Sequence, residues 1–597
     1  MELKSRAEMN PDFTWDLSHM YENDAAWEAA FKECDAEVDR LAAVRGTLGA
    51  SAESLKKGLD VFSEIMEKIE KVYIYTMLKK SSDNSDPANQ ELNGRATRLI
   101  VKASMLSSFA EPEILAIPEE TLNEYMKDES LAVYRQFIEN IARGKAHVLD
   151  EEREKMLAQL SDAAGSPSDA FEMLTNVDME FPTVTDENGN EIRLTNGNFG
   201  VFRLSSDRRV RAEAFEKYFG TYKKYNNTLA TLYGGSVKFD TYFADVHNHT
   251  SARAAALFRS NAPESVYDSL LEAIHGALPS MKRYLALRQK TLGLEKLDAF
   301  DLYTPMLEDV KYPMPYESGK ALVLEALKPL GEEYCALLRR AFDERWIDVY
   351  ENKGKRSGAF SCGVYGVHPY VLLNYTDELD DAFTLAHELG HAMHSYKSSE
   401  TQEYINNDYK IMVAEVASTV NEVFMTMHLL KTETDKKRRA YILNNFLESF
   451  RTTVFRQTLF AEFEKEVHDM YKNGQTLTAQ ALNDTYKALL CKYYEGADIP
   501  DIMAYEWSYI PHFYNAFYVY QYATGFCSAV AIAKRILDTG DTEGYLKFLT
   551  LGGSDYPLEE LKVAGIDLTK PEAVANAMKV FDDTITELEQ ILDELNA

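Results

Sequence analysis

The residues with the clearest capacity for chemistry lie together in the segment His387-Glu388-Leu-Gly-His391. If this segment is helical, His387 and His391 lie one turn apart on the same face and can direct both imidazoles at a single ion. Glu388 would lie beside that ion, where a carboxylate can take a proton from a water molecule that the metal activates. The pattern His-Glu-x-x-His therefore predicts a zinc site whose general base lies on the same helix as two of its ligands.

A catalytic zinc ion usually has a third protein ligand and keeps one position open for water. A third histidine six residues after His391 is excluded, because position 397 is Lys397. The apolar segment 408–425 predicts a second buried helix, and it contains Glu415 and Glu422, seven residues apart and hence on one face. A carboxylate in so apolar a helix is costly unless it is paired or bound to metal. One glutamate is therefore predicted to bind the ion and the other to orient an imidazole, and the spacing leaves both assignments open.

Other polar side chains near these helices are weaker candidates for ligands of the ion. Glu400 and Glu403 lie in a polar connector, where simple solvation explains them. His394 lies seven residues after His387, on the same helical face. It either orients a ligand or is a buried histidine with no role at the ion, and the sequence favours neither.

Motifs in chain order make the sequence recognisable. They are His387–His394, Glu415–Glu422 and His512–Gly525, accompanied by Trp15-Asp-Leu17 and Arg203–Arg208. Together they resemble the oligoendopeptidase F branch of the thimet-oligopeptidase family, and the likeness extends over nearly the whole chain. The resemblance implies a mainly α, two-lobed helical zincin, with a deep substrate channel and a small β-sheet beside the His-Glu-x-x-His helix.

The same resemblance implies a role for each residue of the zinc site. His387, His391 and Glu415 would bind one Zn²⁺ ion. This choice of Glu415 over Glu422 rests on the resemblance, because helix geometry left the two open. Zinc would polarise the scissile carbonyl and activate water, and Glu388 would pass the proton of that water to the leaving amine.

The segment His512–Tyr522 combines a histidine with several tyrosines. Such side chains can donate hydrogen bonds to the oxyanion that forms when water attacks a peptide carbonyl. Packing of aromatic rings against a neighbouring helix is the simpler explanation, and the resemblance reverses that judgement for His512 and one tyrosine. The pattern Phe517-Tyr-Val-Tyr520 selects Tyr520, and the competing candidates are Tyr514, Tyr518 and Tyr522.

Several elements must position these residues. Gly358–Gly363 and Pro369–Tyr375 alternate with a period near two and are predicted to form strands beside the metal-binding helix. An extended peptide could pair with an edge strand of this kind, or the sheet could be purely structural. Asp377 or Asp380 could cap the helix that follows and place negative charge at its N-terminus.

The rest of the chain suggests two lobes. Helical spacing of apolar residues dominates the first 175 residues. Asn188-Gly189 then separates two alternating segments and predicts a β-hairpin within 177–194. Placing the boundary just beyond the hairpin, near Asn196, gives an N-terminal helical lobe at 1–195 and a catalytic zinc-peptidase domain at 196–597.

Composition restricts the possible partners and location. A chain of 597 residues with 45% hydrophobic residues is long enough for more than one core. A formal net charge of −32 argues against binding nucleic-acid phosphates. The sequence has no apolar run of about 18 residues and its first residues lack an apolar core, so neither a membrane span nor a secretory signal is predicted. The five cysteines are scattered without a Cys-x-x-Cys pair, and we expect reduced thiols in a cytoplasmic protein.

We therefore expect a zinc-dependent endopeptidase that hydrolyses internal bonds of short oligopeptides, with no nucleic-acid or membrane partner. One alternative is a zinc carboxypeptidase or dipeptidase of related fold, which would use the same metal chemistry but release free amino acids. The other is a helical peptide-binding protein with a decayed site. That alternative is disfavoured because candidate ligands, base and oxyanion donors are present together.

Overall fold

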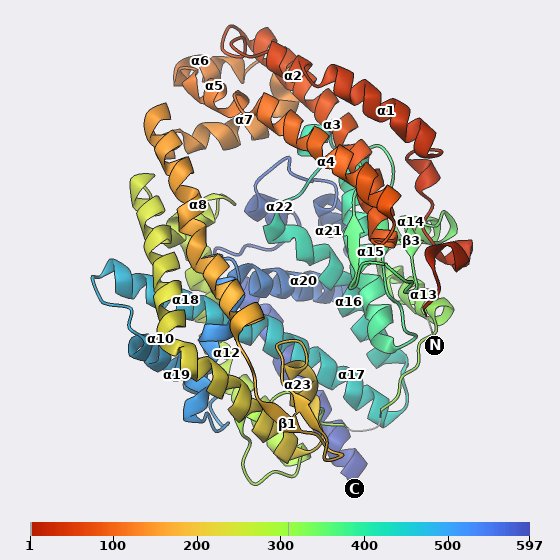
Figure 1. Cartoon of the computed structure of the whole chain (residues 1–597). Coiled ribbons are helices and arrows are strands. Elements are labelled where there is room, and N and C mark those ends of the chain that lie inside the picture. Colours follow the sequence, from red (N-terminus) through yellow and green to blue (C-terminus); the bar gives the residue numbers. More distant parts are fainter. Residues whose placement is uncertain (1–2, 308–309, 597) are drawn as a thin grey trace. The chain divides into compact units, whose positions relative to one another are not determined.

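The computed structural model describes residues 3–307 and 310–596, and most of its regular structure is helical (Figure 1). The prediction of a mainly α-helical protein is confirmed. The chain forms two compact units. Unit 1 comprises Met1–Lys145, Tyr312–His428 and Ile532–Ile566, and unit 2 comprises Ala146–Lys311, Leu429–Ala531 and Asp567–Ala597.

These units differ from the predicted domains, because each unit is assembled from three separate stretches of chain. Packing between residues far apart in sequence decides this assembly, and no local pattern in the sequence records it. That residues 1–195 form an N-terminal lobe and 196–597 a catalytic domain stays a prediction.

Unit 1 contains helices from the N-terminal part of the chain and a second group of helices around a small sheet. Its α-helices are α1 (Asp24–Glu37), α2 (Arg40–Ala43), α3 (Ala52–Ser82), α4 (Pro87–Ser107), α5 (Ala110–Ala116), α6 (Glu119–Tyr125), α7 (Arg135–Ala142), α13 (Tyr316–Ala326), α14 (Glu332–Asp343), α15 (Leu379–Thr401), most of α16 (Ile411–Thr432), α21 (Glu543–Phe548) and α22 (Pro557–Val563). Its strands are β3 (Ile347–Asp348), β4 (Phe360–Cys362) and β5 (Tyr370–Leu372). Its shorter helices are η1 (Arg6–Glu8), η2 (Pro11–Phe13), η3 (Leu17–His19), η4 (Glu129–Tyr134), most of η5 (Arg143–His147), η8 (Lys328–Leu330) and η9 (Tyr404–Asn406).

The sheet of unit 1 lies next to α15. Its strand order is β3-β5-β4, with β3 parallel and β4 antiparallel to β5. The register pairs Ile347 with Val371 and Phe360 with Leu372. Strand β4 is an edge strand of this sheet and packs against α15. The two predicted strands beside the His-Glu-x-x-His helix are therefore confirmed.

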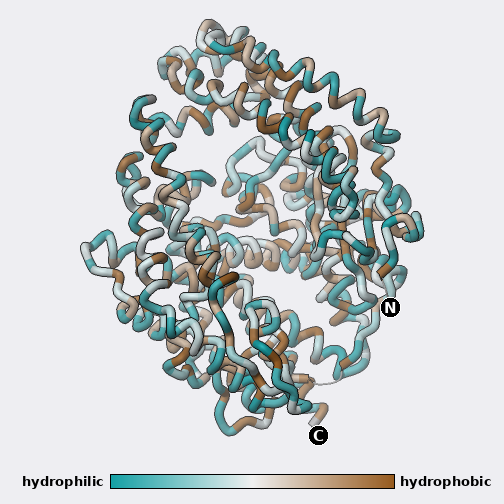
Figure 2. Tube along the Cα trace, viewed as in Figure 1, coloured by the Kyte–Doolittle hydropathy of each residue, from teal (hydrophilic) through white to brown (hydrophobic). Residues whose placement is uncertain are grey.

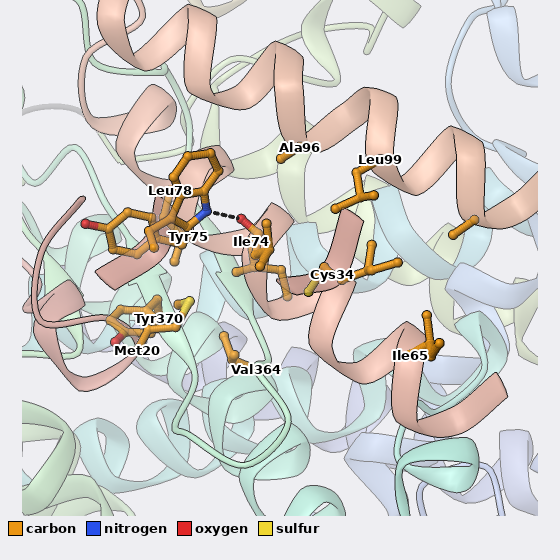
Figure 3. Packing of buried hydrophobic residues seen from close by; sticks show 14 of the residues in the cluster. Met20, Cys34, Ile65, Ile74, Tyr75, Leu78, Ala96, Leu99, Val364 and Tyr370 are labelled. Atoms are coloured by element: carbon orange, nitrogen blue, oxygen red, sulfur yellow. Dashed lines mark hydrogen bonds between the residues drawn. The ribbon is translucent and has the colours of Figure 1, made fainter. Parts of the chain in front are cut away.

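A hydrophobic core joins the N-terminal helices of unit 1 to this sheet. Ile65 and Tyr75 from α3 and Leu99 from α4 pack in one cluster with Val364 and Tyr370 (Figure 3). All five side chains are buried. Full burial of a large apolar side chain stabilises a fold by about 1.5–3 kcal/mol. The core therefore anchors the sheet, and with it one side of α15, to a large apolar cluster.

Unit 2 is almost entirely helical. Its α-helices are α8 (Glu151–Met173), α9 (Phe199–Leu204), α10 (Arg208–Val246), α11 (Ala252–Phe258), α12 (Glu264–Thr291), α17 (Lys436–Ser449), α18 (Arg456–Lys472), α19 (Ala479–Tyr493), the first part of α20 (Tyr520–Thr539) and α23 (Glu572–Asn596). The shorter helices are η6 (Leu174–Asp178), η7 (Ala299–Asp301), η10 (Phe450–Phe455), η11 (Asp501–Tyr509) and η12 (Pro511–Tyr514). Strands β1 (Thr183–Thr185) and β2 (Glu191–Arg193) pair antiparallel, which confirms the hairpin predicted from Asn188-Gly189.

Hydrophobic and hydrophilic residues alternate along the helices of both units (Figure 2). This pattern is typical of helices that bury one face and expose the other to water. Among the residues that the structure describes, no helix combines the length and the apolar character that crossing a membrane requires.

Candidate metal centre

His387, Glu388 and His391 lie on α15, as their spacing predicted. The residue that caps this helix is Glu378, which forms a capping box with Asp381. The expectation that Asp377 or Asp380 is the cap is therefore wrong. The backbone of Asp377 is left-handed, with φ of 65°, which places this residue in the turn before the helix. Asp380 lies inside the first turn, where its charge still suits the positive end of the helix dipole.

The second helix of the site, α16, lies unusually close to α15. A Cβ atom added at Gly390 would lie 2.5 Å from the Cα atom of Ser418, so only glycine allows this approach. The side chain of Asn421 donates a hydrogen bond of 2.9 Å to the carbonyl of Ala386 on α15. Tyr334 in turn donates to the Asn421 side chain at 3.0 Å. The two helices are thus held in register at the level of the predicted metal ligands.

Three potential ligand atoms converge where the helices meet. The Nε2 atoms of His387 and His391 lie 3.4 Å and 3.5 Å from Glu415 Oε2. The donor atoms of these residues all lie within 4.8 Å of one another. Ligands about 2.05 Å from a tetrahedral zinc ion are separated by roughly 3.3 Å, which is close to both measured distances. Two imidazoles and a carboxylate in this arrangement fit a zinc ion that keeps a fourth position open.

Glu422 contacts the opposite nitrogen of His387. Its Oε1 atom lies 2.5 Å from His387 Nδ1, so the carboxylate can accept the Nδ1–H and leave Nε2 to face Glu415. Burial lowers the pKa of His387, but hydrogen bonds to Glu415 and Glu422 outweigh burial and raise that pKa to about 10. Hydrogen bonds from His387 and His391 hold the pKa of Glu415 well below its usual range. A metal ion that binds here must therefore displace a proton from His387.

Glu388 follows His387 directly and is buried, with 7% of its surface exposed. Burial raises the pKa of its carboxyl, against the charges of His387 and His391, which lower it. A carboxylate with a raised pKa accepts a proton more readily at neutral pH. Glu388 therefore lies beside a predicted ligand on the same helix, with a carboxyl whose pKa is raised.

His394, Glu400 and Glu403 lie outside this group of donors. The ring of His394 stacks on that of Tyr409, with centroids 3.8 Å apart, and its side chain is buried. Burial lowers the pKa of His394 to about 3, so its imidazole is neutral at physiological pH. Glu400 lies in the last turn of α15, where it forms an ion pair with Lys397, so the expectation that it lies in a connector is wrong. Glu403 lies beyond the helix and is exposed, as expected for a polar connector.

His512 lies in unit 2, on the exposed side of η12. The ring of Tyr522 is 6.2 Å from the His512 ring, and the ring of Tyr518 is 5.4 Å from that of Tyr522. Burial lowers the pKa of His512, which favours a neutral imidazole that can still donate one N–H. His512 and two half-buried tyrosines therefore form one aromatic cluster.

The other candidate tyrosines, Tyr520 and Tyr514, pack against aromatic rings of unit 2. Tyr520, the first residue of α20, is 2% exposed and its ring lies 5.2 Å from that of Tyr267. Tyr514 stacks on Phe171 with ring centroids 4.6 Å apart. Burial raises the pKa of both phenols, so each keeps its proton at neutral pH.

Sequence reasoning missed the side chains that connect the two metal-site helices. Asn421 is fully buried, and it links Ala386 on α15 to Tyr334 on α14. Ser418 donates a hydrogen bond to Glu415 Oε2 at 3.2 Å. A signal was present for Asn421, because an amide within so apolar a helix must find partners. Nothing local identified the partners themselves.

Comparison with known protein families gives two matches that together extend over most of the chain. Residues 201–580 match the family described as "Peptidase family M3". Residues 113–181 match the one described as "Oligopeptidase F".

Individual relatives match over the full length. Oligopeptidase PepF of Bacillus subtilis (strain 168) is 42% identical over 595 residues, covering 99% of this chain and 89% of that protein. The oligoendopeptidase F homolog of Lactococcus lactis subsp. lactis (strain IL1403) is 40% identical over 597 residues, covering 99% of each. Among solved structures, oligoendopeptidase-F of Enterococcus faecium has 38% identity and a TM-score of 0.72, covering 96% of this chain and 99% of that one. A candidate peptidase of Chlamydophila abortus has 33% identity and a TM-score of 0.95, covering 99% and 100%.

Proposed function

The chain belongs to peptidase family M3, in its oligopeptidase F branch, and from that premise we propose that His387, His391 and Glu415 bind a single zinc ion used for peptide-bond hydrolysis. The protein is a metalloendopeptidase that degrades oligopeptides. The observation that carries the ligand assignment is the convergence of two imidazole nitrogens on one oxygen of Glu415, at 3.4 Å and 3.5 Å.

The chemistry divides between the ion and the protein side chains. When bound, zinc polarises the scissile carbonyl and lowers the pKa of a water molecule towards about 7. Glu388 accepts the proton of that water and later delivers it to the leaving amine. Glu422 fixes the ring of His387 through Nδ1, so that Nε2 remains available as a ligand atom.

The oxyanion of the reaction needs hydrogen-bond donors, and we assign this role to His512 and one tyrosine of its segment. Tyr520 is the tyrosine that the sequence pattern selects. Tyr520 is buried against Tyr267, whereas the ring of Tyr522 lies near that of His512. These two observations support Tyr522 as the competing candidate. Phenylalanine at either position would remove the hydroxyl and keep the ring. Of the two variants Tyr520→Phe and Tyr522→Phe, the one with the larger fall in kcat identifies the tyrosine that donates to the oxyanion.

Analysis of cleavage products tests the proposed activity directly. A peptide of about ten residues, acetylated at its N-terminus and amidated at its C-terminus, should be cut into internal fragments. A chelator should abolish the reaction and added zinc should restore it. The variant Glu400→Gln, outside the group of donors, is the matched control and should behave as the wild type. Release of free amino acids only, or activity that a chelator leaves unchanged, would overturn the proposal.

The proposal also covers the cellular location of the enzyme and its partners. All five cysteines are free thiols, which supports a reducing, cytoplasmic location. Selection of short peptides is expected, from the family resemblance, to depend on the predicted N-terminal lobe at 1–195. Substrates are oligopeptides, and no nucleic-acid or membrane partner is proposed.

A further inference from the structure

The segment that carries His512 and the candidate tyrosines contains a strained backbone position. Phe517 has φ of 58°, in the left-handed region. Bulky residues other than glycine rarely adopt this conformation, because the Cβ atom crowds the backbone. Such strain persists only where the surroundings enforce it, and it concentrates at functional sites. The contacts of Phe517 therefore show what holds this segment in place.

The backbone of Phe517 is held by a buried carboxyl group from another element. Its N–H donates a hydrogen bond of 2.9 Å to Glu464 Oε1 on α18. The side chain of Glu464 is completely buried, and its other oxygen has no hydrogen-bond partner among the described residues. A carboxyl group in such surroundings is costly to bury. It is better suited to holding the strained backbone than to stabilising the core.

Aromatic contacts also hold the side chain of Phe517. Its ring lies 4.6 Å from the ring of His468, one turn after Glu464 on α18, and 5.8 Å from the ring of Tyr267. Tyr267 also packs against Tyr520, with ring centroids 5.2 Å apart. The midpoint of the segment is thus fixed through both its backbone and its ring.

We propose that Glu464 is a positioning residue for catalysis, whose buried carboxyl holds the backbone at Phe517 and thereby sets the positions of His512 and of the tyrosines in segment 518–522. The inference rests on the proposed oxyanion role of this segment. Glu464 itself is completely buried. Its effect reaches the reaction through the segment, because small displacements of a hydrogen-bond donor sharply weaken stabilisation of a transition state.

Three variants separate positioning from general stability. Glu464→Met keeps the bulk but removes the acceptor, and kcat should fall about 10- to 100-fold with KM within about twofold of the wild type. Glu464→Gln keeps an acceptor oxygen and should retain activity within about twofold. Burial raises the pKa of Glu464 well above its usual range, which favours the neutral acid that an amide imitates. Glu466→Met, at a half-buried glutamate on the same helix, is the matched control and should leave kcat unchanged.

Hydrogen exchange supplies a readout that a purely structural role would not move. In Glu464→Met, amides of peptides from residues 512–522 should exchange faster, while peptides from α15 keep wild-type exchange and the zinc content stays the same. A general loss of stability would instead accelerate exchange in both regions. If Glu464→Met does not fold, the Gln variant still decides, because inactive Glu464→Gln with wild-type exchange would overturn the inference.

The outcomes also distinguish this inference from the proposed function. Full activity in His512→Gln, Tyr520→Phe and Tyr522→Phe would remove the oxyanion role on which the inference depends. A large loss in one of those variants together with wild-type kcat in Glu464→Met would refute positioning by Glu464 alone. Low kcat in Glu464→Met, recovered in Glu464→Gln and accompanied by faster exchange confined to 512–522, is the expected result.

Discussion

Replacing Gly390 by alanine should separate the two helices of the metal centre. The added Cβ would lie 2.5 Å from Ser418 Cα, 2.6 Å from the Ala417 carbonyl oxygen and 2.7 Å from Ser418 N. These are backbone atoms, so no side-chain rotation can relieve the clash. Ordinary contacts of this kind begin near 3.4 Å, and α15 and α16 must therefore move apart by about 1 Å locally.

The energetic balance is against the substitution. Overpacking of a closed interface costs about 1–3 kcal/mol. Alanine has the higher helix propensity, and replacing glycine by alanine inside a helix stabilises the fold by about 1 kcal/mol. The net loss of stability should therefore lie between about 0 and 2 kcal/mol. The unfolding temperature of the variant measures this loss.

The substitution should have a larger effect on the affinity of the site for zinc. Glu415 lies one turn before Ser418, so a shift of α16 moves its carboxylate away from His387 and His391. Ligand distances in a metal site tolerate only about 0.2 Å of error. We expect zinc affinity to fall at least tenfold, as it does when outer partners of a ligand are lost. Titration with zinc against a competing chromophoric chelator measures this directly.

The control for this experiment is Gly276→Ala on α12. An alanine Cβ there meets no atom within 4 Å, so the substitution should leave zinc affinity unchanged and stabilise the protein by up to about 1 kcal/mol. Wild-type zinc affinity and unfolding temperature in Gly390→Ala would refute the reasoning, because they would mean that the close contact of the two helices has no part in holding Glu415.

Three further predictions concern single carboxyl groups. Glu388→Gln should keep one zinc per chain but lose nearly all activity, since an amide cannot accept the proton; normal cleavage by the purified variant would disprove the role of general base. Glu422→Gln should weaken zinc binding about 10- to 100-fold through the loss of a charged partner of His387, whereas Glu400→Gln should bind zinc normally in the same titration. Burial, together with the charge of Asp555, raises the pKa of Glu560 from 4.5 to about 8. The folded protein therefore loses stability as pH rises from about 4.5 to 8, by a few kcal/mol in total, because the unfolded chain ionises this group first. Glu560→Gln should accordingly unfold at a higher temperature than the wild type at pH 9, with a much smaller difference at pH 5; equal differences at the two pH values would contradict this assignment.

The features that the sequence predicted correctly depend on local geometry. The helix has a fixed pitch, so the four-residue interval between His387 and His391 was enough to place both imidazoles on one side of α15. The pair Asn188-Gly189 was enough for the hairpin, because Gly189 supplies the positive φ of 85° that the turn requires. Both inferences involve residues that are close in the chain.

Where the sequence was insufficient, the deciding contact is with a distant residue or with a competing local one. Asn421 bridges α15 and α14 through Ala386 and Tyr334, and no spacing within one helix contains that information. The prediction of the N-cap of α15 was wrong for a local reason. Four acidic residues precede or begin the helix, and the left-handed backbone at Asp377 selects Glu378 among them.

The two glutamates of α16 show how tertiary structure resolves a choice that helical geometry leaves open. They are seven residues apart, or about 10 Å along the helix axis, and the ring of His387 lies between them. Its Nδ1 faces Glu422 and its Nε2 faces Glu415. The Nε2 atom of His391 also faces Glu415. An ion shared by both histidines must therefore lie on the Glu415 side, and Glu422 can act only through the ring of His387. The direction in which α16 passes α15 determines which glutamate has which role, and that direction is a property of the packed fold rather than of either helix.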